Sequence, residues 1–248
     1  MPNCVSYDPT YAHEVAVIIQ DGLRRMFTEQ EDVFYYLTLM NENYEHPGLP
    51  EDRRDEVIEG IKRGMYLLRS TSPDTMGGAT GPRVQLLGSG TILREVEAGA
   101  ELLATEHGVA ADVWSCPSFT ELGRDTIATD RWNLLHPGEQ QRTAWVTTQL
   151  SRRPAGPVVA ATDYMRAFAE QIRPSVPADR RYVVLGTDGF GRSDYRKALR
   201  RHFEVDRQHV AVAALAALAA DGTVPTSAVT DAIARYGIDP DKVDPAHA

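Results

Sequence analysis

The chemically richest stretch of this sequence is residues 186–194, which read Gly-Thr-Asp-Gly-Phe-Gly-Arg-Ser-Asp. The apolar run Tyr182–Leu185 before it is typical of a buried strand, and Tyr195–Phe203 after it is typical of a helix. In α/β proteins, loops that leave a parallel strand and open a helix commonly bind ligands. Backbone amides at such a helix start can hold an anion, but the carboxylates of Asp188 and Asp194 oppose one by their charge.

Two glycine-rich turns do not match the fingerprint of a dinucleotide-binding loop. In the turn Gly88-Ser89-Gly90, that fingerprint needs a third glycine three residues after Gly90, and position 93 is leucine. The glycines of residues 186–191 fall in a different order. We therefore interpret residues 88–90 as a plain turn between a strand and a helix, with a phosphate cradle as the alternative.

A second polar loop, Asn41-Glu42-Asn43-Tyr44, follows the predicted strand Val33–Met40. Polar groups at the carboxyl end of a strand fit a site or an interface. The alternative, to which we give equal weight, is a loop held by its own side-chain hydrogen bonds, because asparagine favours turns. His46 lies in the same loop and is the one histidine that we would test for a role. The seven histidines form no pair with the spacing of a zinc site.

Composition and charge exclude several classes of protein. The 248 residues carry 26 Lys and Arg against 35 Asp and Glu, and the net charge of −9 argues against a general nucleic-acid binder. The longest apolar stretch, Val210–Ala220, is too short for a membrane span of about 20 residues. Cys4 and Cys116 have no metal-binding spacing, and we expect Cys116 to be a buried thiol. Since Met1 opens no signal peptide, we expect a cytoplasmic protein with neither nucleic-acid nor membrane partners.

The chain divides into two segments by composition. Residues 1–72 are predicted to hold a helix that ends near Met26, the strand Val33–Met40, a helix over 52–63 and, as the last strand of the segment, Met65–Leu68. Residues 73–83 are rich in Thr, Gly and Pro and are predicted to be a linker. Residues 84–248 form the second predicted domain.

Strands and helices alternate in the second segment. The predicted strands are Val84–Leu87, Ala111–Ser115, Val158–Ala161 and Tyr182–Leu185. The predicted helices cover about 92–106, 119–124, 165–173, 195–203, 207–220 and 227–236. Short apolar strands between amphipathic helices indicate an α/β fold, with a mostly parallel sheet that carries helices on both faces.

Several stretches along the whole chain together resemble the homodimeric type of pyruvate dehydrogenase, the thiamine-diphosphate-dependent component that decarboxylates pyruvate. They are Pro2–Pro9, Asn41–Tyr44 with Pro47 and Pro50, Ser118–Leu122, Arg131–Asn133 with Leu135–Pro137, Thr162–Met165, Gly186–Asp194 and His202–Asp206. Any one stretch is a weak signal, but the set in this order is highly specific.

The resemblance implies a fold, cofactors and partners. Members of the family have a diphosphate-binding domain, a pyrimidine-binding domain and a carboxyl-terminal domain of transketolase type. Residues 1–72 resemble the end of the pyrimidine-binding domain, and residues 84–248 resemble the whole carboxyl-terminal domain. The full-length family uses thiamine diphosphate and magnesium, forms homodimers and acetylates the lipoyl group of a dihydrolipoyl acyltransferase.

The resemblance assigns no catalytic, cofactor-binding or metal-binding residue to this chain. The family's magnesium and diphosphate motif begins Gly-Asp-Gly, which does not occur here, and the family's activating glutamate and active-site histidines precede the segment that matches Met1. We therefore expect no cofactor to bind this chain alone, and we expect the chain alone to be inactive. The candidate site residues are loop residues for an interface or for substrate approach: Asn41, Glu42, Asn43, Tyr44, His46, Asp188, Gly189, Phe190, Gly191 and Arg192.

Two hypotheses of different classes follow from the sequence. In the first, the chain is a part of pyruvate dehydrogenase that is active only with the rest of the enzyme. In the second, it is a non-enzymatic transketolase-like module for dimerisation or complex assembly.

Overall fold

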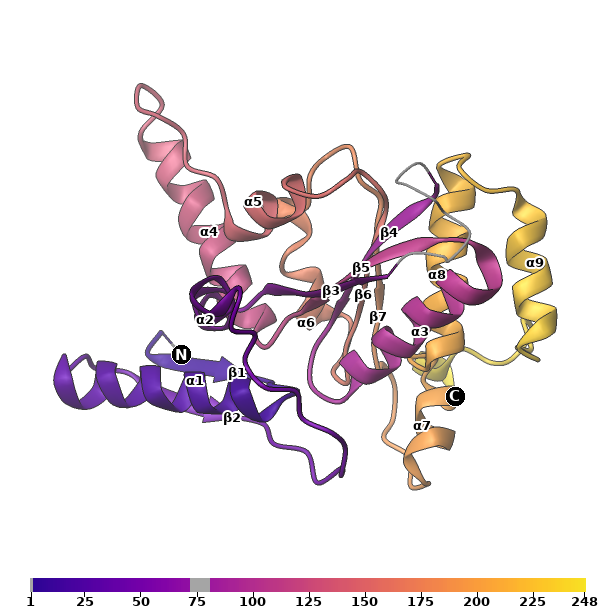
Figure 1. The fold of residues 1–248 in the computed structure, drawn as a ribbon, viewed down its shortest axis with the longest axis horizontal. Helices are drawn as coiled ribbons and strands as arrows, with labels where there is room; N and C mark the ends of the chain where they lie inside the picture. The colour runs from indigo at the N-terminus through magenta and orange to yellow at the C-terminus, as the bar shows by residue number, and fades with distance from the viewer. Residues whose placement is uncertain (1, 72–80) are drawn as a thin grey trace.

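The computed structural model describes residues 2–71 and 81–248. The chain forms a main body around a five-stranded sheet, and a smaller amino-terminal segment lies against one side of it (Figure 1). The predicted linker 73–83 falls largely outside the described residues. No helix within the described ranges has both the length and the apolar character of a membrane span.

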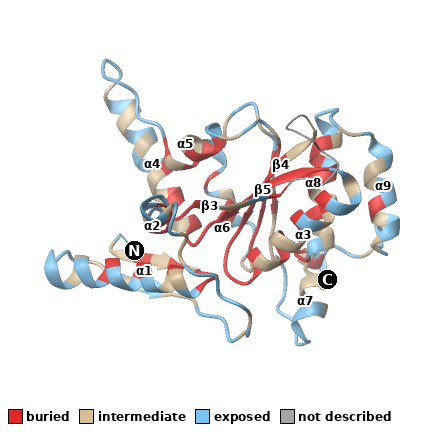
Figure 2. Cartoon of the chain, viewed as in Figure 1, coloured by how far each residue is buried: buried red, intermediate tan, exposed pale blue. Residues whose placement is uncertain are grey.

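The larger sheet has the strand order β3-β5-β4-β6-β7. Strands β4 (Arg83–Gly88), β5 (Ala110–Ser115), β6 (Val158–Ala161) and β7 (Tyr182–Leu185) run parallel, and β3 (Tyr66–Thr71) is antiparallel to β5. The predicted bounds of β6 and β7 are confirmed. Strands β5 and β6 are buried along their whole length, and β4 is buried after Arg83 (Figure 2), which is the burial that a parallel sheet covered on both faces requires.

Helices cover both faces of this sheet (Figure 1). One face carries α3 (Ile92–His107), α8 (Arg207–Ala220) and α9 (Thr226–Arg235), and the other carries α4 (Phe119–Leu135), α5 (Trp145–Ser151) and α6 (Ala167–Glu170). Side chains alternate along β4, so that Val84 and Leu86 face the α3 side and Leu87 faces the α4 side. The remaining helical elements are the 3₁₀ turn Arg173–Ser175, α7 (Arg196–His202) and the 3₁₀ turn Pro245–His247. The predicted α/β fold class is confirmed.

The amino-terminal segment has a small sheet and core of its own. Strands β1 (Cys4–Tyr7) and β2 (Phe34–Leu37) pair in parallel. Helices α1 (Ala12–Leu23), which continues as a π-helical turn over Arg24–Thr28, and α2 (Arg54–Arg63) complete the segment. The core of the segment contains Val5, Tyr7, Val17, Ile18, Val57, Ile61 and, from β3, Tyr66.

One strand was assigned to the wrong sheet from the sequence. We expected Met65–Leu68 to be the last strand of the amino-terminal segment, but β3 pairs with β5 in the larger sheet. The chain changes sheets at Gly64, whose φ of +92° ends α2 and whose absent side chain leaves room for the carbonyl oxygen of Ser118. The Ser- and Gly-rich tract that suggested the boundary comes later in the chain than this turn. Strand β1 and helix α5 were not predicted, and the helix end predicted near Met26 falls within the π-helical turn that continues α1.

The turn between β4 and α3 packs against the amino-terminal segment. The Gly90 amide donates to the carbonyl of Asp8 at 2.9 Å, and the hydroxyl of Thr10 donates to the Gly90 carbonyl at 2.6 Å. Ser89 is buried and donates to the hydroxyl of Thr162. Because the segment uses the Gly90 amide, the turn is the plain connection expected and its glycine amide is not available to a phosphate.

A buried carboxylate holds the two parts of the molecule together. Glu14 of α1 has no exposed surface, and its Oε2 accepts the backbone N–H groups of Thr10 (2.5 Å) and Tyr11 (3.0 Å). Its Oε1 accepts the hydroxyls of Ser115 at the end of β5 (2.5 Å) and Tyr66 of β3 (2.7 Å). A charged group this deeply buried is tolerated only with such donors.

One face and one edge of the small sheet are open. The amide of Phe34 donates to the carbonyl of Asn3, just before β1, and the amide of Thr38 donates to the carbonyl of Tyr7 in β1. Because amides alternate along a strand, those of Tyr35 and Leu37 point to the opposite edge. No strand of the described chain lies along that edge. Seven large apolar side chains of the segment are 41% to 73% exposed: Ile19, Leu23, Phe27, Phe34, Tyr36, Leu39 and Met40. Phe34 and Tyr36 alternate along β2 with the core residues Tyr35 and Leu37, so these two side chains lie on the uncovered face of the small sheet.

We expect Glu14→Gln to lower the free energy of unfolding by about 3 kcal/mol, because the amide group can no longer accept all four donors and presents its own N–H₂ to them. Urea unfolding measures the loss. Glu139→Gln is the matched control, since Glu139 is exposed and its carboxylate contacts no other group within the described residues; it should change stability by less than about 0.5 kcal/mol. Equal stability of the two variants would contradict the role of Glu14.

Asp112 predicts an acid-sensitive step in stability. Its carboxylate is fully buried, pairs with Arg83 (2.8 Å) and Arg153 (2.7 Å), and accepts the hydroxyl of Ser70. Burial alone would raise the pKa of Asp112, but hydrogen bonds from Arg153 and Ser70 outweigh it and hold the pKa below its usual 3.8. The stability that this lowered pKa contributes is complete above the unfolded value and is lost as the pH falls through the folded one.

We therefore expect Asp112→Asn to weaken the fall in melting temperature that the protein shows when the pH is lowered from 5 to 3, while lowering stability at pH 7. Asp32→Asn, at an exposed position, should keep the pH profile of the unchanged protein. A profile of Asp112→Asn parallel to that of the control would show that Asp112 does not titrate in this range.

Candidate functional site

In chain order, the first predicted loop is residues 41–46 and the second is residues 186–194. Glu42 is the central residue of the first. Its carboxylate accepts Nη1 of Arg94 from α3 at 2.8 Å and Nη2 of Arg200 from α7 at 2.6 Å, and it lies 3.7 Å from Nε of Arg196. Asn41 beside it accepts Nη2 of Arg196 through its side-chain oxygen and through its carbonyl. Glu42 and Asn41 thus connect the amino-terminal segment to two helices of the main body.

Tyr44 and His46 face the start of α1. The hydroxyl of Tyr44 donates to the carbonyl of Thr10, and the guanidinium of Arg94 lies 4.4 Å from the centre of the Tyr44 ring. Nδ1 of His46 accepts the amide of Ala12 at 3.1 Å, so this histidine caps a free N–H at the helix start. Asn43 is exposed. The side chains of this loop, apart from Asn43 and Glu45, are therefore held by contacts within the chain.

The second predicted loop is anchored at its start and exposed beyond it. Asp188 pairs with Arg166 at 2.7 Å. Gly189 has φ +107°, and a β-carbon there would lie 2.1 Å from the carbonyl oxygen of Pro245, so the carboxyl-terminal turn requires a glycine. Phe190 is 79% exposed, and Gly191 and Arg192 are exposed as well.

The structure does not bring the two predicted loops into direct hydrogen bonding among the described residues. Helix α7 follows the second loop, and Arg196 and Arg200 on it reach the first loop. Asp194 accepts the amide of Tyr195 just before α7, which fits its expected place at the helix start.

Four arginines gather around two carboxylates at this junction, and we call Arg94, Arg196, Arg200 and Arg207 the arginine cluster. Beyond the bonds to Glu42, Arg200 donates Nη1 to Glu95 at 3.1 Å, and Arg207 donates Nε to Glu95 at 2.9 Å. Burial alone would raise the pKa of Glu95, but the hydrogen bonds and charge of Arg207 outweigh it and hold the pKa below its usual value. The cluster is therefore a site of high positive potential.

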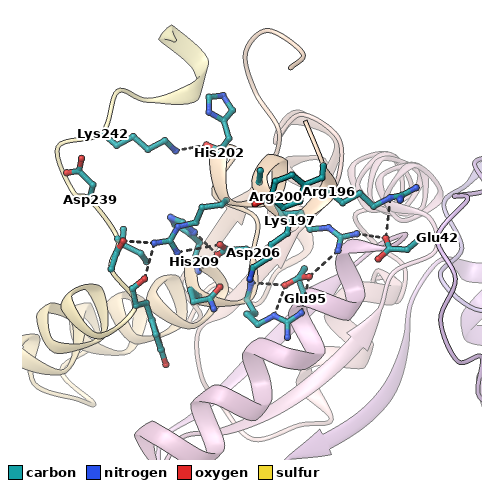
Figure 3. Close-up of a pocket in the computed structure, with 18 residues that line it drawn as sticks. Glu42, Glu95, Arg196, Lys197, Arg200, His202, Asp206, His209, Asp239 and Lys242 are labelled. Carbon is teal, nitrogen blue, oxygen red and sulfur yellow. Dashed lines mark hydrogen bonds and ion pairs between the residues drawn. The ribbon is translucent and has the colours of Figure 1, made fainter. Parts of the chain in front are cut away.

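A pocket of about 1000 Å³ lies beside the cluster (Figure 3). Its walls come from α7, from the first turn of α8 and from the chain that follows α9, residues 236–242. Six Lys or Arg side chains and four carboxylates line it. Asp206, which also lines the pocket, is the cap of α8. Its carboxylate accepts the backbone N–H of His209 and lies 2.7 Å from Nδ1 of the same residue.

Glu42 was predicted from the sequence, but its arginine partners were not. The signal was present in α7, where Arg196 and Arg200 are four residues apart and must share a helix face. The sequence could not show that this face meets Glu42 and Glu95, which are more than 100 residues away in the chain.

The arrangement has the groups to bind charge, and it shows no catalytic constellation. The described residues contain no set of three or more His, Cys, Asp or Glu side chains placed to hold a metal ion. Cys116 is fully buried, as expected, and burial raises the pKa of its thiol, which makes it unreactive.

The sheet order and the helical layers define a class of protein. Residues 64–206, more than half of the chain, match the family described as the transketolase-like TK C-terminal domain, and the chain belongs to this family. Residues 1–47 match the family described as the pyruvate dehydrogenase E1 component middle domain.

The curated relatives are pyruvate dehydrogenase E1 components. The chain is 56% identical to that of Cupriavidus necator over 245 residues, 55% identical to that of Pseudomonas aeruginosa over 245 residues and 54% identical to that of Escherichia coli K12 over 246 residues. Each match covers 99% of this chain and 26% of the relative. The chain thus spans about a quarter of the length of these relatives, and the resemblance to pyruvate dehydrogenase is confirmed.

Solved transketolases share the fold. The enzyme from Pichia stipitis superimposes with a TM-score of 0.54 at 16% identity, over 88% of this chain and 25% of that one. The enzyme from Leishmania mexicana gives 0.53 at 20% identity, over 91% and 27%. A split-gene transketolase, solved as an inactive β4 tetramer, gives 0.56 at 16% identity, over 88% and 59%. At these identities the likeness shows the fold alone.

We expect Arg200→Ala to lower the free energy of unfolding by about 3 kcal/mol, because the Arg200 side chain is only 13% exposed and its loss leaves Glu42 and Glu95 with fewer buried partners. Arg196→Ala is the comparison, since its side chain is 53% exposed, and it should cost less than about 1 kcal/mol. Chemical denaturation measures both. A larger loss for Arg196→Ala would reverse this ranking of the two arginines.

Proposed function

We propose that this chain is the carboxyl-terminal part of a pyruvate dehydrogenase, the thiamine-diphosphate-dependent component that oxidatively decarboxylates pyruvate and acetylates the lipoyl group of a dihydrolipoyl acyltransferase. The observation that carries the proposal is the identity of more than half the residues, over nearly the whole chain, to E1 components about four times as long. On the same grounds we propose a cytoplasmic enzyme that works as a homodimer.

The domain division rests on the same relatives and on the two sheets. We propose that residues 1–72, except for β3, complete a pyrimidine-binding domain, and that residues 84–248, with β3 added at the sheet edge, are the transketolase-like carboxyl-terminal domain. The match of residues 1–47 to the middle-domain family supports this division. The open face and edge of the β1–β2 sheet support it too, because a parallel sheet in such a domain is covered on both faces.

We propose that this chain does not itself hold the cofactors of the full-length family. Thiamine diphosphate, when bound, supplies the electron sink for the carbanion formed in decarboxylation. The described residues hold no cluster of metal ligands, and the sequence lacks Gly-Asp-Gly. We therefore assign no step of the reaction to a residue of this chain and propose that the cofactors bind elsewhere in the enzyme.

The two predicted loops receive different roles in this proposal. We propose that residues 41–46 join the pyrimidine-binding and carboxyl-terminal domains, which the bonds of Glu42 to Arg94 and Arg200 support. We propose that the exposed half of the second loop, Phe190, Gly191 and Arg192, meets a partner subunit or approaching substrate, which the exposure of Phe190 supports.

The second candidate function is a non-enzymatic module for dimerisation or complex assembly. The parallel strands of residues 84–248, with helices on both faces, favour it. A split-gene transketolase chain of the same fold has been solved as an inactive β4 tetramer.

The test is complementation. We expect the purified chain to show neither thiamine diphosphate binding in calorimetry nor pyruvate decarboxylation. Co-expression with the part of the Cupriavidus necator E1 component that has no counterpart here should give a co-purifying, active complex. Micromolar cofactor binding by the chain alone would contradict the proposed division of the enzyme, and failure to co-purify would favour the assembly module.

A charge on the open sheet face tests the same complex. We expect Tyr36→Lys to reduce co-purification with the complementing part at least tenfold, because Tyr36 is 60% exposed on β2 and the new charge would be buried in the joint interface. Leu134→Lys is the matched control, since Leu134 is 77% exposed near the end of α4, away from the small sheet (Figure 1). Equal co-purification of both variants would place the interface elsewhere.

A further inference from the structure

We propose that the pocket beside α7 binds a small molecule that carries a phosphate group, with the phosphate at the arginine cluster. This site goes beyond the proposed function, because it lies in the carboxyl-terminal domain and does not depend on the decarboxylation chemistry. Three features of the pocket support this site: an excess of positive charge at one end, the fixed geometry of the arginines there, and the different character of the other end.

The charge around Glu42 and Glu95 is not balanced. The four guanidinium groups of the arginine cluster share these two carboxylates. Lys197 adds a positive charge to the same wall and has no hydrogen-bond or ion-pair partner within the described residues (Figure 3). The excess is local, because the whole chain has a net charge of −9. An anion of two or more charges would compensate it.

Two further carboxylates, Asp206 and Asp163, lie close to the arginine cluster. The charges of Arg200 and Arg196 act on Asp163, but burial is the dominant effect and raises the pKa of this group. Asp163 lines a separate cavity of about 120 Å³ on the other side of α7, together with Arg196 and Arg200. The six Lys and Arg side chains that line the pocket exceed its four carboxylates, Asp206 and Asp239 included, by two charges.

The arginines are held in place before any ligand arrives. Arg200 donates Nη1 to Glu95 and Nη2 to Glu42, while Arg207 donates both Nε and Nη2 to Glu95. These bonds fix the planes of the guanidinium groups and leave Nε of Arg200 and Nη1 of Arg207 without a protein acceptor in the described structure. Fixed, planar donors are well suited to phosphate oxygens, and their order reduces the entropy lost on binding.

The opposite end of the pocket has a different character. There Arg201 donates to the carbonyls of Tyr236 and Gly237, and it also faces Asp206, so its charge is used internally. Ile238 and Asp239 complete this end. A ligand would therefore place its phosphate at the arginine cluster and an uncharged polar body toward residues 236–239. The volume of about 1000 Å³ accommodates such a molecule.

The proposal is tested by calorimetry on the full chain with inorganic pyrophosphate and with a simple phosphate monoester, each at constant ionic strength adjusted with NaCl. We expect one saturable site whose affinity falls as the salt concentration rises. Lys197→Gln should weaken binding roughly tenfold, because it removes a charged donor to phosphate. Lys197 is exposed on α7, so this change leaves the fold intact.

Arg192→Gln is the matched control. Arg192 is an exposed cation only five residues from Lys197 but does not line the pocket, and its loss should change the affinity by less than about twofold. Absence of saturable binding for both probes would overturn the proposal. An equal loss in Lys197→Gln and Arg192→Gln would also overturn it, since that result would mean that the probes follow the general charge of the surface.

Discussion

The position of the amino-terminal segment depends on one buried carboxylate. Glu14 accepts four donors from three parts of the chain: the residues before α1, β3 and the end of β5. A carboxylate with no exposed surface costs several kcal/mol if its donors are withdrawn. Because Ser115 and Tyr66 belong to the larger sheet, α1 cannot turn or slide against that sheet without losing part of this set. The small sheet, and with it the loop after β2, is thereby fixed relative to the main body.

The arginine cluster provides the second connection, and it differs in kind. Glu14 is satisfied by neutral donors, whereas Glu42 and Glu95 are surrounded by more positive charge than they carry. A satisfied network stabilises one arrangement and leaves nothing for a ligand to gain. An unbalanced one retains an attraction for an anion after folding is complete. This difference is why the pocket beside α7, rather than the region around Glu14, is the binding site that we infer.

Much of the fold was predictable because its strands and helices have strong local patterns. Strands β6 and β7 are short, wholly apolar runs, and the Ala-rich apolar run of α8 predicts a buried helix. Strand β3 shows the limit, since its residues were recognised as extended but its partner, β5, lies 40 residues further on. Of the candidate site, Glu42 and Asp188 were predicted from their place after strands. Arg94 and Arg207 were missed because nothing in their local sequence shows that Glu42 and Glu95 lie beside them in the fold.

The sequence alone determined the α/β class and the alternation of strands and helices in residues 84–248. Through its scattered motifs, it also determined the resemblance to pyruvate dehydrogenase. These depend on local periodicity and on residue identity, both of which can be read directly from the sequence. Only the tertiary structure decided that β3 joins the larger sheet, that the Gly90 amide donates to the carbonyl of Asp8, and that Glu42 contacts arginines from two helices. Each of these depends on contacts between residues distant in sequence, whose energies are set by burial and by the charges that folding brings together.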